Sequence, residues 1–342
     1  MRRTVGLILA GVGAFLIVMA IVLPTYIVPS ISKFPLNEYE TATLTGSNVT
    51  YFSPKLLTVV NGTNVTATYT VKGTGQGTSS RATWELFNDT YDTTSKLDIQ
   101  EMYRKFSFDR KTTQIINCCG STYNGTGNVG YVWPIPTDAK TYMVFDSTVL
   151  QTEPYRYVGN DTIDGISVYK FNETVAPTKV TFTPLSTIYP EYATEDNTYW
   201  IDPSTGAILN VDQRTHRYLA DPATGALKQE LFNGDLKFTP ATIQYVVGLD
   251  NSGRGELQLL SIVLPLVFGF GGGAALVAGL LLFRLNPREQ AAPGSPGSLG
   301  SPDGAERAPS PRHAANGHTS AEPTNVAIVP GLDSSPDDPS GA

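Results

Sequence analysis

Cysteine and histidine are scarce in this sequence, with two and three of the 342 residues respectively. Two cysteines cannot form the several cross-links of a disulfide-rich scaffold, and they cannot supply a four-cysteine zinc site. The sequence also lacks the Gly-x-Ser-x-Gly nucleophile motif, the His-Glu-x-x-His metal motif and a glycine-rich phosphate loop. These absences predict a protein that is not an enzyme and has no catalytic residue, no cofactor and no bound metal.

The titratable residues that remain form no recognisable site. His216 is the single histidine between residues 25 and 258, and one histidine is weak support for metal binding or acid–base chemistry. Glu191, Glu195 and Asp196 form an acidic cluster, but their spacing matches no calcium-binding loop. We therefore expect these carboxylates on a solvated face.

The two cysteines, Cys118 and Cys119, are adjacent. Such a pair outside the cytoplasm has three interpretations: a vicinal disulfide, two buried thiols, or bridges to another molecule. The pair precedes Gly120 in a loop-like stretch. We predict the vicinal disulfide.

A strongly basic region is also missing. Between residues 25 and 258 the chain has 18 Lys and Arg against 24 Asp and Glu. This mild acidity keeps a surface soluble and argues against nucleic acid as a partner.

Two long apolar runs, residues 5–24 and 259–283, contain no charged side chain. Each is long enough to cross a hydrocarbon core of about 30 Å as a helix, the only single-segment solution in lipid. The predicted organisation is a cytoplasmic N-terminus (1–4), a transmembrane helix (5–24), an extracytoplasmic domain of one or two subdomains (25–258), a second transmembrane helix (259–283) and a cytoplasmic tail (284–342).

Positive charges next to the apolar runs indicate the orientation. Arg2 and Arg3 precede the first run, and Arg284 and Arg288 follow the second. Because Lys and Arg near a span favour the cytoplasmic side, both termini are predicted to be cytoplasmic and the protein to reside in the plasma membrane. The alternative is a cleaved signal peptide, but no small-x-small cleavage site follows Leu23.

Small residues recur at four-residue spacing on both apolar runs. The two rows are Gly6, Ala10, Ala14 and Gly271, Ala275, Gly279. Such rows let two helices approach closely, so we predict that the spans pair within one molecule through these residues. The alternative is that glycine and alanine are simply common in membrane helices.

The middle region has the composition and patterning of β-strands. Asp164-Gly165 is a two-residue hairpin signal. Residues 199–209 and 218–227 each read as strand, turn and strand around Asp-Pro-x-Thr-Gly, which we interpret as a structural turn. The sequence predicts a mainly β, antiparallel, hairpin-rich domain of rolled or sandwiched sheets.

Two segments differ from this pattern. Helical periodicity between the apolar runs is confined to a weak stretch around residues 97–106. Residues 284–342 are rich in Pro, Gly, Ser and Ala, and such a tail cannot offset its ordering entropy by burial. We predict that the tail is disordered.

Several short motifs follow one another in an order that resembles a known family. They are Phe108-Asp-Arg-Lys-Thr112, Val132-Trp-Pro-Ile-Pro136, Tyr142 with Asp146, Pro154-Tyr155, Asp164-Gly-Ile-Ser-Val-Tyr-Lys-Phe171 and Trp200-Ile-Asp-Pro-Ser-Thr-Gly206. In this order they resemble the porin PorA family of actinobacterial cell-envelope proteins, over most of the chain from the first apolar run through the second. The resemblance implies a bitopic protein with both ends in the cytoplasm, a role in envelope lipid and glycolipid assembly and polar growth, and no catalytic residues.

These observations lead to a functional hypothesis. Two anchors, an aromatic-rich β domain (17 Tyr and 14 Phe in the chain) and the resemblance favour binding of an apolar lipid or lipoglycan precursor next to the lipid bilayer. A scaffold for envelope-assembly or transport proteins is the alternative. A pore is the third hypothesis, although a pore-forming outer-membrane protein needs a closed barrel, and two apolar helices instead favour the inner membrane.

Overall fold

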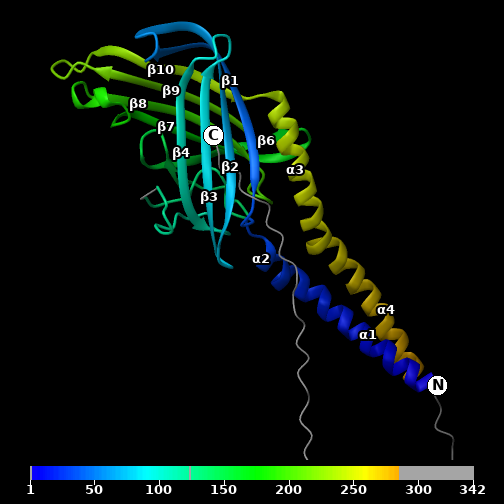
Figure 1. Ribbon diagram of the computed structural model, residues 1–342. Coiled ribbons are helices and arrows are strands. Elements are labelled where there is room, and N and C mark those ends of the chain that lie inside the picture. The colour runs from blue at the N-terminus through cyan, green and yellow to red at the C-terminus, as the bar shows by residue number, and fades with distance from the viewer. Residues whose placement is uncertain (1, 123–124, 285–342) are drawn as a thin grey trace, which may run out of the picture. The chain divides into compact units, whose positions relative to one another are not determined.

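The computed structural model describes residues 2–122 and 125–284 (Figure 1). Ten antiparallel strands form a half-barrel, to which two apolar helical segments are joined. The predicted mainly β, antiparallel fold is confirmed, in the form of one rolled sheet. The tail predicted to be disordered lies, from residue 285 onward, outside the described residues.

The strands follow one another through hairpins and loops. In chain order they are β1 (Tyr39–Ser53), β2 (Thr58–Gly77), β3 (Arg81–Asp92), β4 (Asp98–Asp109), β5 (Tyr142–Asp146), β6 (Gln151–Ile163), β7 (Ile166–Val180), β8 (Glu191–Ile201), β9 (Ile208–Ala220) and β10 (Leu227–Phe238).

The order of strands in the sheet is β4-β3-β2-β1-β10-β9-β8-β7-β6-β5. Two meanders, β1 to β4 and β5 to β10, therefore meet at the centre of the sheet. There β1 pairs with β10, with Leu44 opposite Phe238 and Tyr51 opposite Phe232. Both helical segments are consequently connected to the centre of the sheet and not to its edge strands, β4 and β5.

Left-handed backbone positions close the predicted hairpins. Asp164 and Gly165, with φ of 46° and 83°, join β6 to β7, and Gly206 and Gly225, with φ of 72° and 70°, end the two Asp-Pro-x-Thr-Gly turns. In the second of these turns the Asp221 carboxylate accepts two backbone hydrogen bonds, both of 2.9 Å. The hairpin predictions at these three places are confirmed.

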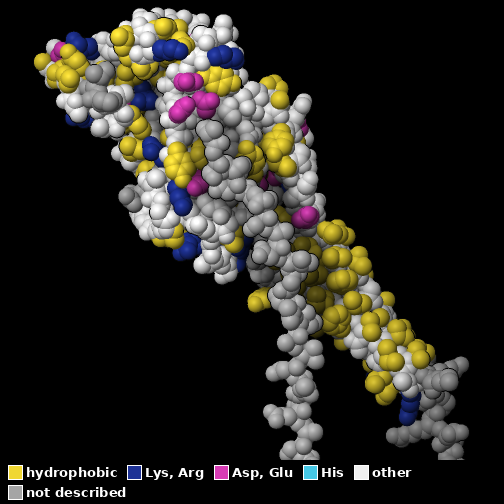
Figure 2. All heavy atoms as spheres, in the orientation of Figure 1, with side chains coloured by type: hydrophobic (Ala, Val, Ile, Leu, Met, Phe, Trp, Pro, Cys, Tyr) yellow, Lys and Arg dark blue, Asp and Glu magenta, His cyan; other side chains and the backbone are white. Residues whose placement is uncertain are grey.

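Both helical segments extend beyond the predicted apolar runs. They comprise α1 (Arg2–Val22), a π-helical turn (Leu23–Ile27) and α2 (Val28–Ile31), and then α3 (Pro240–Gln258), a π-helical turn (Leu259–Val263) and α4 (Leu264–Arg284). Stretches of 29 and 45 residues within them have windows of mean hydropathy 2.8 and 2.2, and are long and apolar enough to cross a membrane. Hydrophobic side chains cover much of the visible surface of α1 and α4 (Figure 2).

Helix α3 corrects the expectation that residues 240–258 lack helical structure. The Thr239 side chain caps this helix by accepting a 3.1 Å hydrogen bond from the Thr242 N–H, and Pro240 stands in the first turn. A second correction concerns residues 97–106, where β4 replaces the weak helix. β4 pairs with β3 along its whole length, and this tertiary pairing outweighs the local helical pattern.

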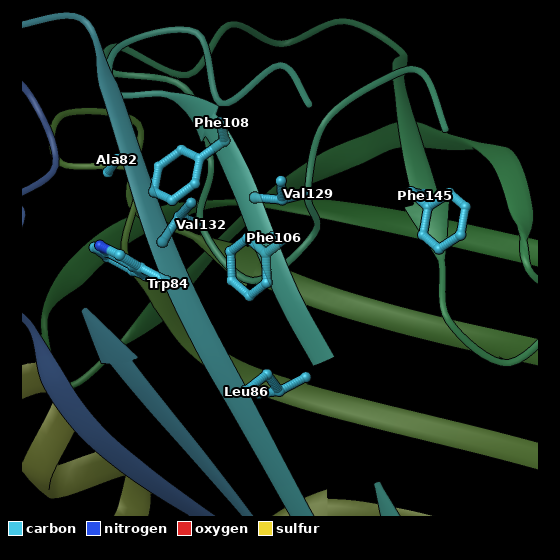
Figure 3. Close-up of a cluster of buried hydrophobic side chains, with 8 residues drawn as sticks. All are labelled: Ala82, Trp84, Leu86, Phe106, Phe108, Val129, Val132 and Phe145. Atoms are coloured by element: carbon cyan, nitrogen blue, oxygen red, sulfur yellow. The ribbon is translucent and has the colours of Figure 1, made fainter. Parts of the chain in front are cut away.

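One core cluster lies between β3, β4 and the segment that leads to β5 (Figure 3). Its buried members are Ala82, Trp84, Leu86, Phe106, Phe108, Val129, Val132 and Phe145. The rings of Trp84 and Phe108 meet edge to face, with centroids 5.1 Å apart. The cluster fixes Trp84, Leu86 and Val132, which also line the cavity described next.

Candidate functional site

The inner face of the half-barrel and α3 enclose a cavity of about 550 Å³. Side chains from three neighbouring strands form a large part of its wall: Ala42, Leu44, Tyr69, Val71, Trp84 and Leu86. Residues two apart on a strand share a face, and the register places Ala42 opposite Tyr69 and Val71 opposite Leu86. The alternation of the strands thus produces one continuous apolar surface.

Helix α3 supplies another wall through one of its faces. The residues that line the cavity from this helix include Val246, Leu249, Gly253 and Leu257. Their spacing of three or four residues is that of a single helix face. Ile31 at the end of α2 and Leu260 in the second π-helical turn also line the cavity. The cavity therefore reaches the level at which the helical segments become apolar.

Two carboxyl groups, Glu38 and Glu40, line the same cavity. Glu40 keeps solvent-accessible surface, although protein atoms surround most of its side chain. The resulting desolvation raises the pKa of Glu40 to about 7, and the charge of Glu38 acts in the same direction. The surroundings of Glu40 therefore favour its protonated form more than bulk water does.

A polar cluster fastens α3 to the turn between β8 and β9. Arg254 Nη1 donates a 2.7 Å hydrogen bond to Oδ2 of the fully buried Asp202, and the Thr205 hydroxyl donates to Asp250. Desolvation, followed by the interaction with Asp202, raises the pKa of Asp250 to about 7. Asp202 and Thr205 belong to the first Asp-Pro-x-Thr-Gly turn. This turn holds the helical wall of the cavity against the sheet.

Tyr69 and Gln213 line both the main cavity and a smaller hollow of about 70 Å³. The Gln213 side-chain amide donates a 2.9 Å hydrogen bond to the Tyr199 hydroxyl. Burial raises the pKa of both Tyr69 and Tyr199, so these hydroxyls stay neutral at physiological pH. The main cavity and the smaller hollow are thus neighbours, and the wall that they share carries neutral polar groups.

Among the described residues, the carboxyl groups that are buried outside the cavity include Asp146, Glu173 and Glu195. Asn197 donates a 2.8 Å hydrogen bond to Glu173, and Thr215 donates a 2.9 Å hydrogen bond to Glu195. Desolvation is the main cause that raises the pKa of Asp146 to about 6, the pKa of Glu173 to about 8 and the pKa of Glu195 well above its ordinary value. Burial therefore favours the protonated forms of Glu173 and Glu195.

The acidic cluster noticed in the sequence is divided between two faces of β8. Glu191 and Glu195 are buried, so the solvated face expected for them is wrong. Glu191 forms a 2.7 Å ion pair with Arg217, while Asp196 faces outward and accepts a 3.0 Å hydrogen bond from Asn172. Strand alternation explains the division, since residues four apart share a face and neighbours do not.

His216 lies on β9. Its Nε2 atom is 2.8 Å from Oε2 of Glu230, and its ring packs against Tyr218 with centroids 4.9 Å apart. These contacts give the histidine a structural role in the sheet, away from the cavity. The exposed acids Asp89, Asp98 and Glu101 bring carboxylate oxygens within 4.8 Å of one another, an arrangement that exposed acids commonly show without an ion.

Cys118 and Cys119 are joined as a disulfide in the structure. They lie in the loop between β4 and β5, and neither lines the cavity. The pair therefore belongs to the loop and not to the candidate site.

The predicted helix-pairing residues meet only in part. Helices α1 and α4 pack antiparallel: a side-chain carbon at Gly6 would lie 2.9 Å from the Gly279 carbonyl oxygen, and one at Gly13 would lie 2.7 Å from that of Gly272. A side-chain carbon at Gly279 would lie 3.0 Å from the Ala10 Cα. The four buried glycines, Gly6, Gly13, Gly272 and Gly279, are seven residues apart on each helix.

Two members of the predicted rows lie away from this contact. Ala14 is exposed, and a side-chain carbon at Gly271 would touch no neighbour within 4 Å. The reason is geometric, because a row at every fourth residue drifts off a contact line that repeats about every 3.5 residues. Ala275 is half-buried, one turn from both buried glycines of α4.

The cavity itself could not be read from the sequence, but one signal points to part of it. Thr239-Pro240 is a helix-start signature that precedes the helical wall. A second signal concerns buried polar groups outside the cavity, because Glu191, Glu195 and Asn197 occur at alternate positions with Ala193 and so share one strand face.

An open antiparallel half-barrel with an apolar cavity, joined to two apolar helical segments, defines a class of membrane-associated β protein. The model of the Porin PorA family matches residues 5–281, and the chain belongs to this family. The Porin PorA of Corynebacterium resistens is 32% identical over 93 residues, which cover 22% of this chain and 22% of that protein. The aligned stretch thus spans about a fifth of the length of that curated relative.

Proposed function

We propose that this protein is a non-enzymatic, membrane-anchored cell-envelope protein that binds a lipid or lipoglycan precursor in the cavity of its half-barrel. The observation that carries the proposal is the position of the cavity. It is lined by apolar strand residues at one end and by Ile31, Leu257 and Leu260 at the other, where the helical segments become apolar. An acyl chain could pass between a bilayer and the cavity without crossing a wide polar surface.

The dimensions and lining of the cavity support a small apolar ligand. Ligand pockets commonly enclose about 300–1,000 Å³, with apolar walls and a few polar groups that orient the ligand. The cavity of about 550 Å³ is in this range, and its polar groups include Glu38, Glu40 and Asp250. The proposed ligand therefore has one acyl-sized apolar part and a polar end.

The proposed membrane arrangement follows the two helical segments. Residues 5–24 and 259–283 cross the plasma membrane, both termini are cytoplasmic, and residues 25–258 form the extracytoplasmic domain. The antiparallel packing of α1 and α4 supports two crossings in opposite directions. The cations that flank the apolar runs support the cytoplasmic location of the ends.

The proposal is tested by purifying the full-length protein from its native host in a mild detergent and extracting bound lipid for mass spectrometry. A lipid that stays bound in stoichiometric amount supports the proposal. A lipid-free protein that copurifies membrane enzymes or transporters instead supports an envelope-assembly scaffold. Ion conductance across a planar bilayer, abolished by denaturing the protein, would support a pore.

A further inference from the structure

A second hollow, here named the basal crevice, lies between the ends of the helical segments and the base of the sheet. Its volume is about 410 Å³. The residues that line it include Ser32, Lys111, Ile135, Ser204, Arg254 and Gln258. Lys111 follows β4, Ser204 is in the β8–β9 turn, and Gln258 is the last residue of α3.

The basal crevice is basic, in contrast to the main cavity. Its lining includes the cations Lys111 and Arg254 and no carboxylate, whereas the charged residues that line the main cavity are one cation, Lys33, and four carboxylates, Glu38, Glu40, Asp250 and Glu256. Arg254 is paired with Asp202 yet keeps 25% of its side-chain surface exposed. Lys111 forms no ion pair among the described residues. The excess positive charge favours an anion with several acceptor oxygens.

The basal crevice adjoins the main cavity. Ser32, Ile135 and Leu257 line both of them. Ile262, in the π-helical turn that begins the second apolar run, also lines the crevice. One ligand can therefore place an apolar chain in the main cavity and its polar end in the crevice, at the level where the helices become apolar.

We propose that the basal crevice binds the phosphate of an anionic phospholipid headgroup, with Lys111 and Arg254 as the cations that face it. The proposal rests on the proposed lipid-binding function and specifies the headgroup. A phosphate offers charge-assisted hydrogen bonds to both side chains, while a neutral lipid with the same acyl chains offers none.

The test compares two lipids with identical acyl chains, phosphatidylglycerol and diacylglycerol, for binding to the delipidated full-length protein in detergent. The wild type is expected to bind phosphatidylglycerol about tenfold more tightly than diacylglycerol. A tenfold difference corresponds to about 1.4 kcal/mol, which one charge-assisted contact can supply. Lys111→Gln removes most of this preference and leaves diacylglycerol binding unchanged. Lys55→Gln, at the exposed β1–β2 hairpin, is the matched control and keeps the preference.

Equal binding of the two lipids by the wild type, or an unchanged preference in Lys111→Gln, overturns the headgroup assignment alone. If the wild-type protein binds neither lipid, both the proposed function and the headgroup assignment are overturned. Glycerol 3-phosphate distinguishes a lipid site from a site for a free phosphate ester. Its failure to displace phosphatidylglycerol at millimolar concentration supports the assignment, and displacement at the potency of the lipid overturns it.

Discussion

Arg254 of α3 and Asp202 of the β8–β9 turn form a 2.7 Å ion pair in which the aspartate is fully buried. The pair connects the long second helical segment to the sheet at the cavity wall. Beside it, Thr205 donates a hydrogen bond to Asp250, so two contacts from one turn fix the same helix. This clamp holds the helical wall of the cavity in place.

Removing Arg254 should destabilise the protein strongly, because it leaves the buried Asp202 carboxylate without its cation. Arg254→Ala is expected to lower the free energy of unfolding by about 3–5 kcal/mol, measured by denaturant titration of the full-length protein in detergent. Lys140→Ala is the control, since its ion pair with Asp138 is exposed to solvent and should contribute little to stability. An equal loss of unfolding free energy in Arg254→Ala and Lys140→Ala would contradict the role of the Arg254–Asp202 ion pair.

The buried carboxyl groups should make stability fall as pH rises. The pKa of Glu173 is raised to about 8 in the folded protein from 4.5, so the folded state holds this proton more tightly than the unfolded state does. Its stabilising contribution is fully present below pH 4.5 and is lost as pH rises through 8. Asp146, with a pKa of about 6, acts in the same direction.

The measurement is the thermal unfolding midpoint between pH 5 and pH 8. In Glu173→Gln the unfolding midpoint should fall less between pH 5 and pH 8 than in the wild type. The variant should also be more stable than the wild type at pH 8, because the amide still accepts a hydrogen bond from Asn197 and cannot ionise. Glu101→Gln, at an exposed position on β4, is the control and should keep the wild-type decline. Asp92, whose pKa is lowered to about 2, has the opposite effect on the pH dependence of stability, but it titrates below pH 5. A wild-type midpoint that rises from pH 5 to pH 8 would refute the prediction.

Filling the cavity should remove lipid without unfolding the sheet. Ala42 points into the cavity from β1, so the indole of Ala42→Trp would occupy space that the ligand needs. We expect at least about half of the bound lipid to be lost, as measured by lipid extraction from the purified full-length protein. Ala176→Trp, at an exposed position on β7, should bind as much lipid as the wild type. Full lipid occupancy in Ala42→Trp would place the ligand elsewhere.

One added methyl group at the contact between α1 and α4 should be enough to disturb their packing. A side-chain carbon at Gly13 meets Gly272 backbone, so Gly13→Ala must push α1 and α4 apart. Ala10→Cys and Ala275→Cys, introduced together with Cys118→Ser and Cys119→Ser, should cross-link within one molecule, and Gly13→Ala should reduce the yield several-fold. Gly11→Ala is the control because its position is open. Absence of an intramolecular product in the parent protein would contradict the pairing.

The fold was predictable where a few adjacent residues determine the conformation. Asp164-Gly165 and the two Asp-Pro-x-Thr-Gly turns have backbone requirements that few residue types satisfy, and all three form the expected hairpins. Helix α3 was missed because Asn251, Ser252, Gly253 and Gly255 weaken its periodicity, and its stability depends on contacts with distant strands.

The candidate site was less predictable, because it depends on which strands become neighbours. Ala42 and Trp84 line one cavity only because β1, β2 and β3 are adjacent and curved. Of the predicted helix-pairing rows, Gly6, Ala10 and Gly279 lie at the contact between α1 and α4, together with Gly13 and Gly272, which the rows omit. An alignment of Gly6 and Gly13 with Gly272 and Gly279 requires knowing how the two helices cross.

The pairing of β1 with β10 has a consequence for the order in which the chain folds. Leu44 and Phe238 are paired although the whole of the other eight strands lies between them in sequence. Each meander can assemble from local hairpins as it is synthesised, but the central pair must wait until β10 exists. Until that moment β1, paired only with β2, is an edge strand, and we expect its pairing with β10 to be the slow, long-range step of folding. Substitutions in the paired parts of β1 and β10 should therefore slow folding more than equivalent substitutions within either meander.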